Sequence, residues 1–163
     1  MIRKVTNFDA KKIADIYNYY IVNSVATFEE KEITSEEISK RIARDKLSGL
    51  PWIVAEDNQE IVGYAYATEW NKRSAYRFTV ETTVYLLNSA VSKGWGNKLY
   101  GVLYSELKNM NVHMVIGGIT LPNQVSVALH EKFGMKKVAH FSEVGFKFNK
   151  WHDVGYWQVQ LDV

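Results

Sequence analysis

The chain contains no cysteine and only two prolines, Pro51 and Pro122. The lack of cysteine excludes disulfide bonds, metal sites built from thiolates and covalent intermediates carried on a cysteine sulfur. No apolar run approaches the length that crosses a bilayer, and the N-terminal segment lacks a secretory hydrophobic region. We therefore expect a cytoplasmic protein with no membrane partner.

Charges of the two signs are nearly balanced: 20 Lys and Arg residues and 18 Asp and Glu residues give a net charge of +2. The basic residues are scattered, so the sequence does not favour a nucleic-acid partner. His113 and His140 show no metal-ligand spacing, and we assign no metal. A length of 163 residues suits one well-buried core, and no repeat or linker divides it, so we predict a single domain over residues 1–163.

The pattern of apolar residues and breakers predicts an α/β fold. Thr34 or Ser35, together with Glu37, offers an N-cap for a helix that ends near Ser48-Gly49. Asp57 and Asn58 predict the turn of an antiparallel hairpin over residues 52–70. The other expected strands cover residues 1–6, 78–87, 112–120, 135–147 and 154–162, and the other expected helices cover residues 8–22, 95–109 and 124–133.

A glycine-rich loop joins one of these strands to the helix that follows. The order is TVETTVYLL, then SKGWGN, then apolar residues at helical spacing: Leu99, Val102, Leu103 and Leu107. Gly94 and Gly96 let the backbone approach an anion closely, and the start of a helix presents unpaired N–H groups. The segment therefore favours a site for a nucleotide or a coenzyme pyrophosphate. The alternative is a glycine turn that only changes the chain direction.

A second block, VHMVIGGITLPNQVSVALHEKFGM, covers residues 112–135 and contains a strand, a Leu-Pro-Asn stop, a short helix and Phe-Gly-Met. In this order the two blocks resemble the general N-acetyltransferase superfamily, which uses acetyl-CoA. The loop pattern of that family is Gln/Arg-x-x-Gly-x-Gly/Ala, and Val91 replaces its leading residue here. The chain looks most like the phosphinothricin and methionine sulfoximine acetyltransferase branch, through residues 16–29, 73–86, 118–135 and 144–158.

The resemblance implies a central, mostly antiparallel twisted sheet flanked by helices. It also implies direct acetyl transfer to an amine within a ternary complex, and a homodimer, for which 47% hydrophobic residues leave enough apolar surface. The coenzyme contacts that the resemblance implies are Val84, Tyr85, Leu86, Ser92, Lys93, Gly94, Trp95, Gly96, Asn97 and Asn123. Asn123 follows Pro122 and precedes a helix, so it is also a candidate helix cap.

Transfer to an amine needs a base, because only the neutral amine attacks and amines are protonated near neutral pH. Glu81 is the candidate, since it lies in a strand otherwise made of Thr, Val and Tyr. It either faces a cleft or is costly to bury. From the residues alone, a solvent-facing glutamate on an alternating strand fits as well. The resemblance favours the general base, because Thr79-Val80-Glu81 matches the Thr-Val-Glu of this branch.

His130 is the second catalytic candidate. It occupies the position where much of the superfamily has a tyrosine that protonates the departing thiolate, and this branch commonly has Leu-His-Glu there, as here. A histidine can act as an acid near neutral pH. The alternative is a partly buried histidine that forms a hydrogen bond with the backbone.

Substrate selection is assigned to Phe28, Arg73, Tyr76 and Arg77. Guanidinium groups bind carboxylates and phosphinates bidentately, so two arginines suit a small amino acid with a second anionic group. A pair of arginines on a solvated face is the alternative.

Three functions are compatible with the sequence. The leading one is acetyl-CoA-dependent N-acetylation of a small amino-acid analogue such as phosphinothricin, methionine sulfoximine or methionine sulfone. The alternatives are N-terminal acetylation of proteins or peptides, and an acyl-CoA-binding sensor without turnover. The presence of Glu81 argues against the sensor.

Overall fold

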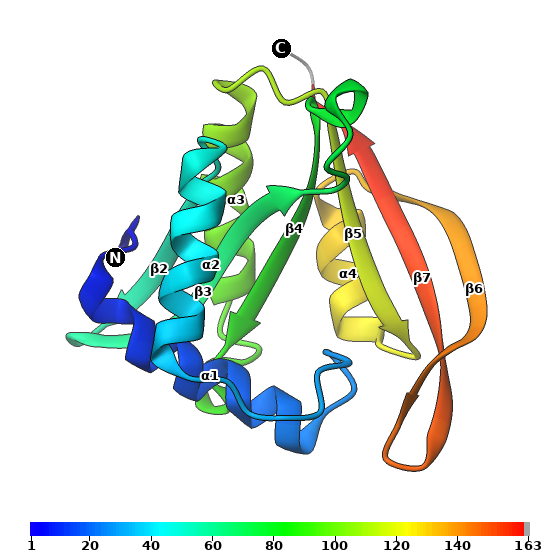
Figure 1. The fold of residues 1–163 in the computed structure, drawn as a ribbon, viewed down its shortest axis with the longest axis horizontal. Helices are drawn as coiled ribbons and strands as arrows, with labels where there is room; N and C mark the ends of the chain where they lie inside the picture. The colour runs from blue at the N-terminus through cyan, green and yellow to red at the C-terminus, as the bar shows by residue number, and fades with distance from the viewer. Residues whose placement is uncertain (162–163) are drawn as a thin grey trace.

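The computed structural model describes residues 1–161 as a seven-stranded sheet with helices on both faces (Figure 1). The strands lie in the order β1-β2-β3-β4-β5-β7-β6, and only the β4–β5 pair is parallel. The strands are β1 (Ile2–Lys4), β2 (Trp52–Asp57), β3 (Glu60–Glu69), β4 (Thr79–Leu86), β5 (Met114–Leu121), β6 (Lys136–Lys147) and β7 (Lys150–Gln160). The helices are α1 (Ala10–Asn23), α2 (Ser35–Leu47), α3 (Trp95–Lys108) and α4 (Gln124–Lys132).

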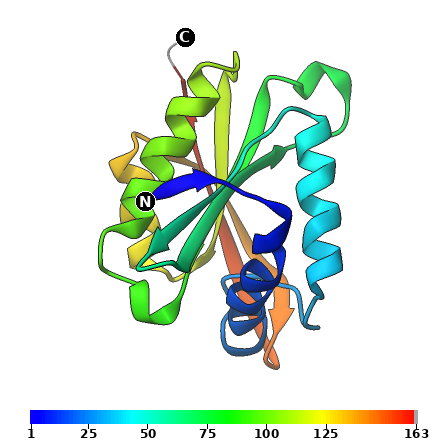
Figure 2. The same cartoon turned by 90° about the vertical axis from the view of Figure 1, so that its left-hand side faces the viewer.

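The helices form two layers, which Figure 2 shows edge-on. Helices α1 and α2 cover one face of the sheet, and α3 and α4 cover the other. Strand β4 contributes to both cores by alternation: Val80 packs with Leu99 and Leu103 of α3, whereas Tyr85 packs with residues of α1. Residues on opposite sides of one strand therefore face different helices.

The local sequence explains where α2 begins. Thr34, rather than Ser35, is the N-cap, because its side-chain oxygen accepts a hydrogen bond from Glu37 N at 3.2 Å. Glu36 and Glu37 lie in the first turn, and Arg44 and Lys46 lie in the last turn, where each charge complements the helix dipole. The helix then turns at Gly49, and the chain enters β2.

Strands β4 and β5 pair over a short stretch and then separate. Their pairing is limited to Thr79 with Met114, Val80 with Val115, and Glu81 with Ile116, although both strands continue for five more residues. Figure 1 shows the two arrows diverging with α4 visible behind the gap. The edge of β4 from residue 82 to residue 86 therefore has no strand partner on the β5 side.

The predicted α/β class with a mostly antiparallel sheet is confirmed. One turn assignment and one strand boundary were wrong. The β2–β3 turn is Asn58-Gln59 rather than Asp57-Asn58, and β7 begins at Lys150 rather than at residue 154. Both turns contain two consecutive residues with positive φ, and such turns join strands tightly; the second is Phe148-Asn149, at 53° and 57°. Residues 150–153, with the sequence KWHD, were left out of the predicted strand, although they form the start of β7, which pairs with β6.

None of the helices within residues 1–161 is long and apolar enough to span a membrane.

Candidate active site

Two cavities meet where β4 and β5 separate. The strand-gap cavity, of about 370 Å³, lies between the free edge of β4 and helix α4. The Glu81 cavity, of about 360 Å³, lies on the face of the sheet that α1 covers. Ala26, Gly118 and Thr120 line both. The two cavities are therefore neighbours that share part of their walls, one beside the start of α3 and the other at Glu81.

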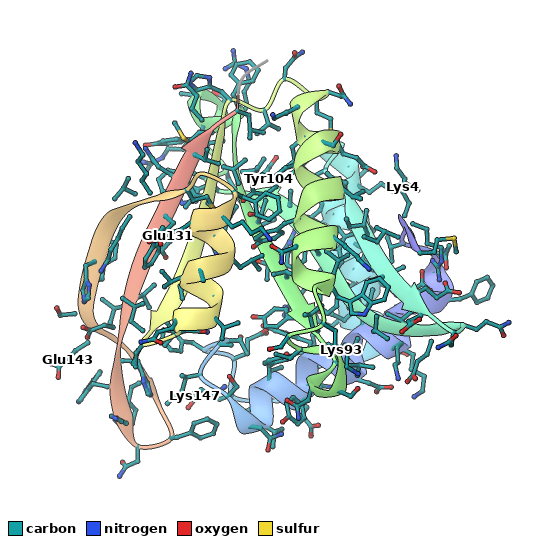
Figure 3. All side chains as sticks on the ribbon, turned by 180° about the vertical axis from the view of Figure 1, so that it is seen from behind. Lys4, Lys93, Tyr104, Glu131, Glu143 and Lys147 are labelled. Carbon is teal, nitrogen blue, oxygen red and sulfur yellow. The ribbon has the colours of Figure 1, made fainter. Side chains whose placement is uncertain are left out.

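The strand-gap cavity contains half of the residues that the sequence assigned to the coenzyme. Val84, Tyr85, Leu86, Gly96 and Asn123 line it. Ser92, Lys93 and Gly94 are exposed in the loop before α3, and Figure 3 marks Lys93 there. Trp95 and Asn97 line a separate open pocket beside Met1 and Lys98. The assigned residues thus occupy both sides of the start of α3.

The loop has the backbone geometry that an anion needs. Gly94 is the N-cap of α3 with a φ of 82°, a conformation that favours glycine, and no side chain caps the helix. The first N–H groups of a 14-residue helix are therefore available to a ligand. Gly96 is buried at the cavity wall, where an added Cβ would lie 3.4 Å from Leu129. A branched side chain at this position would fill the cavity.

Thr82 lies between the strand-gap cavity and two tyrosines of α3. The residue is 3% exposed, and its hydroxyl oxygen is buried without a hydrogen bond of ordinary length among the described residues. The hydroxyl groups of Tyr100 and Tyr104 are its polar neighbours, since Thr82 opposes the rise that burial causes in the pKa of each. The free edge of β4 beside Thr82 fits an extended chain that carries amide and thioester groups, such as the pantetheine arm of acetyl-CoA.

His130 is fixed between two neighbours at the base of the strand-gap cavity. Its Nδ1–H donates to Ser126 O at 2.6 Å, so its Nε2 is left to accept from the Tyr100 hydroxyl at 3.2 Å. A Cβ on Gly117 would approach the imidazole to 2.7 Å, so this ring requires a glycine opposite it. Burial lowers the pKa of His130 below its ordinary value. This geometry favours a neutral imidazole with no proton directed at the cavity.

Asn123 acts as the N-cap of α4, since its side-chain oxygen accepts from Ser126 N at 3.1 Å. The same residue lines the strand-gap cavity. Helix α4 thus holds His130 and Asn123 against the gap that the two strands leave.

Glu81 is the carboxylate of the second cavity. Its neighbours along this wall are Phe28, Gly118 and Tyr156, with Phe141 and Val144 from β6. Burial raises the pKa of Glu81, and within residues 1–161 no side chain forms an ion pair or hydrogen bond with it. A desolvated carboxylate with a raised pKa is a better proton acceptor than an exposed one.

Arg73, Tyr76 and Arg77 do not join Phe28 in this cavity. They lie in the connection between β3 and β4, at the end of β4 remote from the strand gap, and none of them lines either cavity. Arg77 instead donates to Ser74 O at 3.1 Å, and its guanidinium lies 4.4 Å from the centre of the Phe78 ring. The exposed side chains fit a solvated loop of a single chain.

The sequence reading missed several residues that build the site. Ala26 and Tyr20 come from the N-terminal third of the chain, and Thr82 was counted only as a strand residue. One signal was present in the sequence, because Gly117 and Gly118 interrupt an apolar strand, and such glycines often mark a close approach of other groups. Here Gly117 faces His130, and Gly118 faces Tyr156.

No group of three or more His, Asp or Glu residues within residues 1–161 is arranged to hold a metal ion.

Comparison with known proteins places these features in a family. Residues 2–155 match the model of the acetyltransferase (GNAT) domain. The phosphinothricin N-acetyltransferase of Streptomyces viridochromogenes is 37% identical over 99% of this chain and 88% of its own length. The L-methionine sulfoximine/L-methionine sulfone acetyltransferase of Salmonella typhimurium is 31% identical over 99% of this chain and 94% of its own.

A solved structure agrees with these matches. The phosphinothricin acetyltransferase of Sinorhizobium meliloti, in complex with acetyl-CoA, superposes with a TM-score of 0.96 at 32% identity, over 99% of this chain and 88% of its own.

The geometry of His130 predicts a structural role that mutation can separate from acid catalysis. We expect His130→Phe to lower the stability by about 1–3 kcal/mol, because the buried Tyr100 hydroxyl loses the nearer of its two acceptors and keeps only Thr82 O at 3.5 Å. Turnover at saturating substrates should fall less than about tenfold. Thermal unfolding and steady-state kinetics measure the two effects, with Tyr100→Phe as the matched control. A loss of turnover of about 100-fold at unchanged stability would establish His130 as an acid.

Proposed function

Since the chain belongs to the GNAT family of acetyltransferases, we propose that this N-acetyltransferase moves the acetyl group of acetyl-CoA to the amine of a small amino-acid analogue. The observation that carries the proposal is the meeting of the two cavities at Ala26, Gly118 and Thr120. An amine bound beside Glu81 and a coenzyme bound along the free edge of β4 would both contact these three shared residues.

Acetyl-CoA, when bound, supplies an acetyl thioester to this site. We propose that the loop of Ser92, Lys93 and Gly94 holds the diphosphate, and that Val84, Tyr85, Leu86 and Thr82 hold the pantetheine arm. Trp95, Gly96, Asn97 and Asn123 complete the proposed set of coenzyme contacts. Val91 lines the strand-gap cavity in place of a polar residue, so it offers packing and no side-chain hydrogen bond.

The roles of the residues follow from their positions. Glu81, with its raised pKa, removes a proton from the ammonium group of the acceptor, directly or through water. The neutral amine would then attack the thioester carbonyl, the C–N bond would form as the C–S bond breaks, and the departing coenzyme thiolate would take up the proton that the nitrogen loses. No cysteine of this chain takes part because there is none. Phe28, Phe141 and Tyr156 form apolar and aromatic walls that exclude water from the acceptor.

A homodimer is a further proposal. The hairpin of β6 and β7 exposes apolar side chains on an uncovered edge of the sheet, and such a patch is typical of an interface. These side chains are Val138, Phe141, Val144, Phe146, Phe148 and Trp151, each 49–57% exposed. Sedimentation velocity distinguishes a dimer from a monomer of 18.8 kDa. The cytoplasmic location, the single domain and the absence of nucleic-acid and membrane partners stay predictions.

The function is tested by mixing the protein with acetyl-CoA and measuring release of coenzyme thiol. The acceptors are phosphinothricin, methionine sulfoximine, methionine sulfone and a peptide with a free N-terminus. We expect release with at least one small amino acid, and identification of its N-acetyl product by mass spectrometry. Binding of acetyl-CoA without release would support the sensor, and release with the peptide alone would support a protein N-terminal acetyltransferase.

Removal of the carboxylate gives opposite effects on rate and stability. We expect Glu81→Gln to lower turnover about 10²- to 10⁴-fold while the affinity for acetyl-CoA is unchanged. Because burial raises the folded-state pKa of Glu81, the ionised group weakens the fold above its unfolded pKa and has no such effect below it. Thermal unfolding should therefore show Glu81→Gln as stable as the wild type or more so near pH 7. Turnover like that of the wild type across pH would exclude Glu81 as the base.

Substitutions separate Phe28 from the two arginines as substrate contacts. We expect Phe28→Ala to raise the KM of the amine about tenfold, because this ring lines the Glu81 cavity. Arg73→Ala and Arg77→Ala should change that KM about twofold or less, because neither side chain lines a cavity. An anionic amine and a neutral amine are compared for each variant. A larger increase in KM for Arg73→Ala or Arg77→Ala, limited to the anionic amine, would support the arginines as ligands of the anionic group of the substrate.

A further inference from the structure

Lys147, at the end of β6, is a buried cation that the proposed chemistry does not use. It is 2% exposed, and it is the only lysine or arginine in the buried class within residues 1–161. Burial of an ammonium group is costly unless hydrogen bonds replace its water. The contacts of this side chain therefore indicate what the molecule gains from it.

The ammonium of Lys147 binds backbone carbonyl groups of a distant segment. Its Nζ donates to Ser24 O at 2.7 Å and to Thr27 O at 2.9 Å, across more than a hundred residues of sequence. Within residues 1–161 no carboxylate lies within ion-pair distance of it. Burial lowers the pKa of Lys147, and the nearby charges of Glu30 and Glu29 oppose that effect. The charge is thus directed at the peptide dipoles of the segment that follows α1.

This segment, residues 24–28, has no helix or strand of its own and depends on side chains from elsewhere. The Tyr85 hydroxyl donates to Ala26 O at 3.3 Å, and the Tyr17 hydroxyl lies 2.8 Å from the hydroxyl of Thr27. On the hairpin side, His152 Nε2 donates to Lys147 O at 2.9 Å. Figure 3 marks Lys147 where the hairpin of β6 and β7 approaches the segment after α1.

The same segment forms part of the wall of the active site. Ala26 lines both cavities, and Phe28 lines the Glu81 cavity. The Phe28 ring packs on Gly145, two residues before Lys147, so closely that an added Cβ there would overlap the ring. Lys147 and Gly145 therefore act on the same contact: one holds the segment at the hairpin, and the other leaves room for its aromatic ring.

We propose that Lys147 is a positioning residue for the amine acceptor, because its ammonium fixes residues 24–28 as one wall of the Glu81 cavity. The inference rests on the proposed acetylation of an amine at Glu81. Of residues 24–28 only Ala26 lines the strand-gap cavity, and other residues form the diphosphate loop and the free edge of β4, so acetyl-CoA binding depends much less on Lys147 than amine binding does. Loss of a residue needed only for folding would weaken the binding of both acetyl-CoA and the amine. Loss of a positioning residue weakens the binding of the amine alone.

The test compares Lys147→Met with Lys150→Met, an exposed lysine on the same hairpin. We expect Lys147→Met to raise the KM of the amine at least about tenfold, with the Kd of acetyl-CoA unchanged within about twofold by calorimetry. Amide hydrogen exchange at residues 24–28 should become faster in this variant, and Lys150→Met should match the wild type in all three measurements. An unchanged KM, unchanged exchange, or an equal loss of affinity for both substrates overturns the proposal.

The absence of cysteine permits a rescue experiment at this position. Lys147→Cys is alkylated with 2-bromoethylamine in denaturant, where the thiolate displaces bromide and a side chain of lysine length forms, and the protein is refolded. Restoration of the amine KM and of slow exchange at residues 24–28 is expected. Failure of the correctly folded aminoethyl protein to recover either one contradicts a role for the ammonium.

A second variant keeps the proposal testable if the Lys147 variants do not fold. Gly145→Ala retains the ammonium but displaces Phe28, and it should raise the amine KM while leaving the Kd of acetyl-CoA unchanged. An unchanged KM in folded Gly145→Ala overturns the proposal. If the wild type acetylates no amine, the proposed function fails. Hydrogen exchange still tests whether Lys147 holds residues 24–28, because that measurement needs no turnover.

Discussion

The arrangement depends on the limited pairing of two parallel strands. β4 and β5 share three residue pairs and then diverge, so the sheet contains an edge in its interior. An unpaired strand edge is normally a liability, because its N–H and C=O groups attract other strands. Here the imidazole of His130 and the ring of Tyr100 occupy the side of the gap nearest α3 and α4, and Gly117 makes room for the imidazole. The packing of α4 against the sheet and the opening between β4 and β5 therefore depend on each other.

The opening explains why the proposed active site lies in the middle of the sheet. Alternation along β4 directs Thr82 toward α3 and α4, and directs Glu81 toward the face that α1 covers. Adjacent residues of one strand thus serve two cavities that meet through the gap. The segment after α1 closes the second cavity from outside, and it is held by polar contacts with Tyr85 and Lys147 rather than by secondary structure.

The elements and the glycine-rich loop were predictable from the sequence because their signals are local. The periodicity of α3, the cap at Asn123 and the α/β order all come from neighbouring residues. The cavities were not predictable, because Ala26 and Gly118 come to line the same cavity only in the folded chain. The arginines were assigned by closeness along the chain to Glu81. β4 begins at Thr79, so Arg77 lies before that strand, at the end remote from the strand gap.

We propose that the gap between β4 and β5 receives the coenzyme and delivers its thioester to the Glu81 side of the sheet. A crystal structure of the protein with acetyl-CoA tests this arrangement. We expect the diphosphate at residues 92–96, the pantetheine arm along the edge of β4 at residues 82–86, and the acetyl group near Gly118 and Thr120, within reach of the Glu81 cavity. Acetyl-CoA bound outside the gap, with residues 82–86 free of contact, would contradict this arrangement.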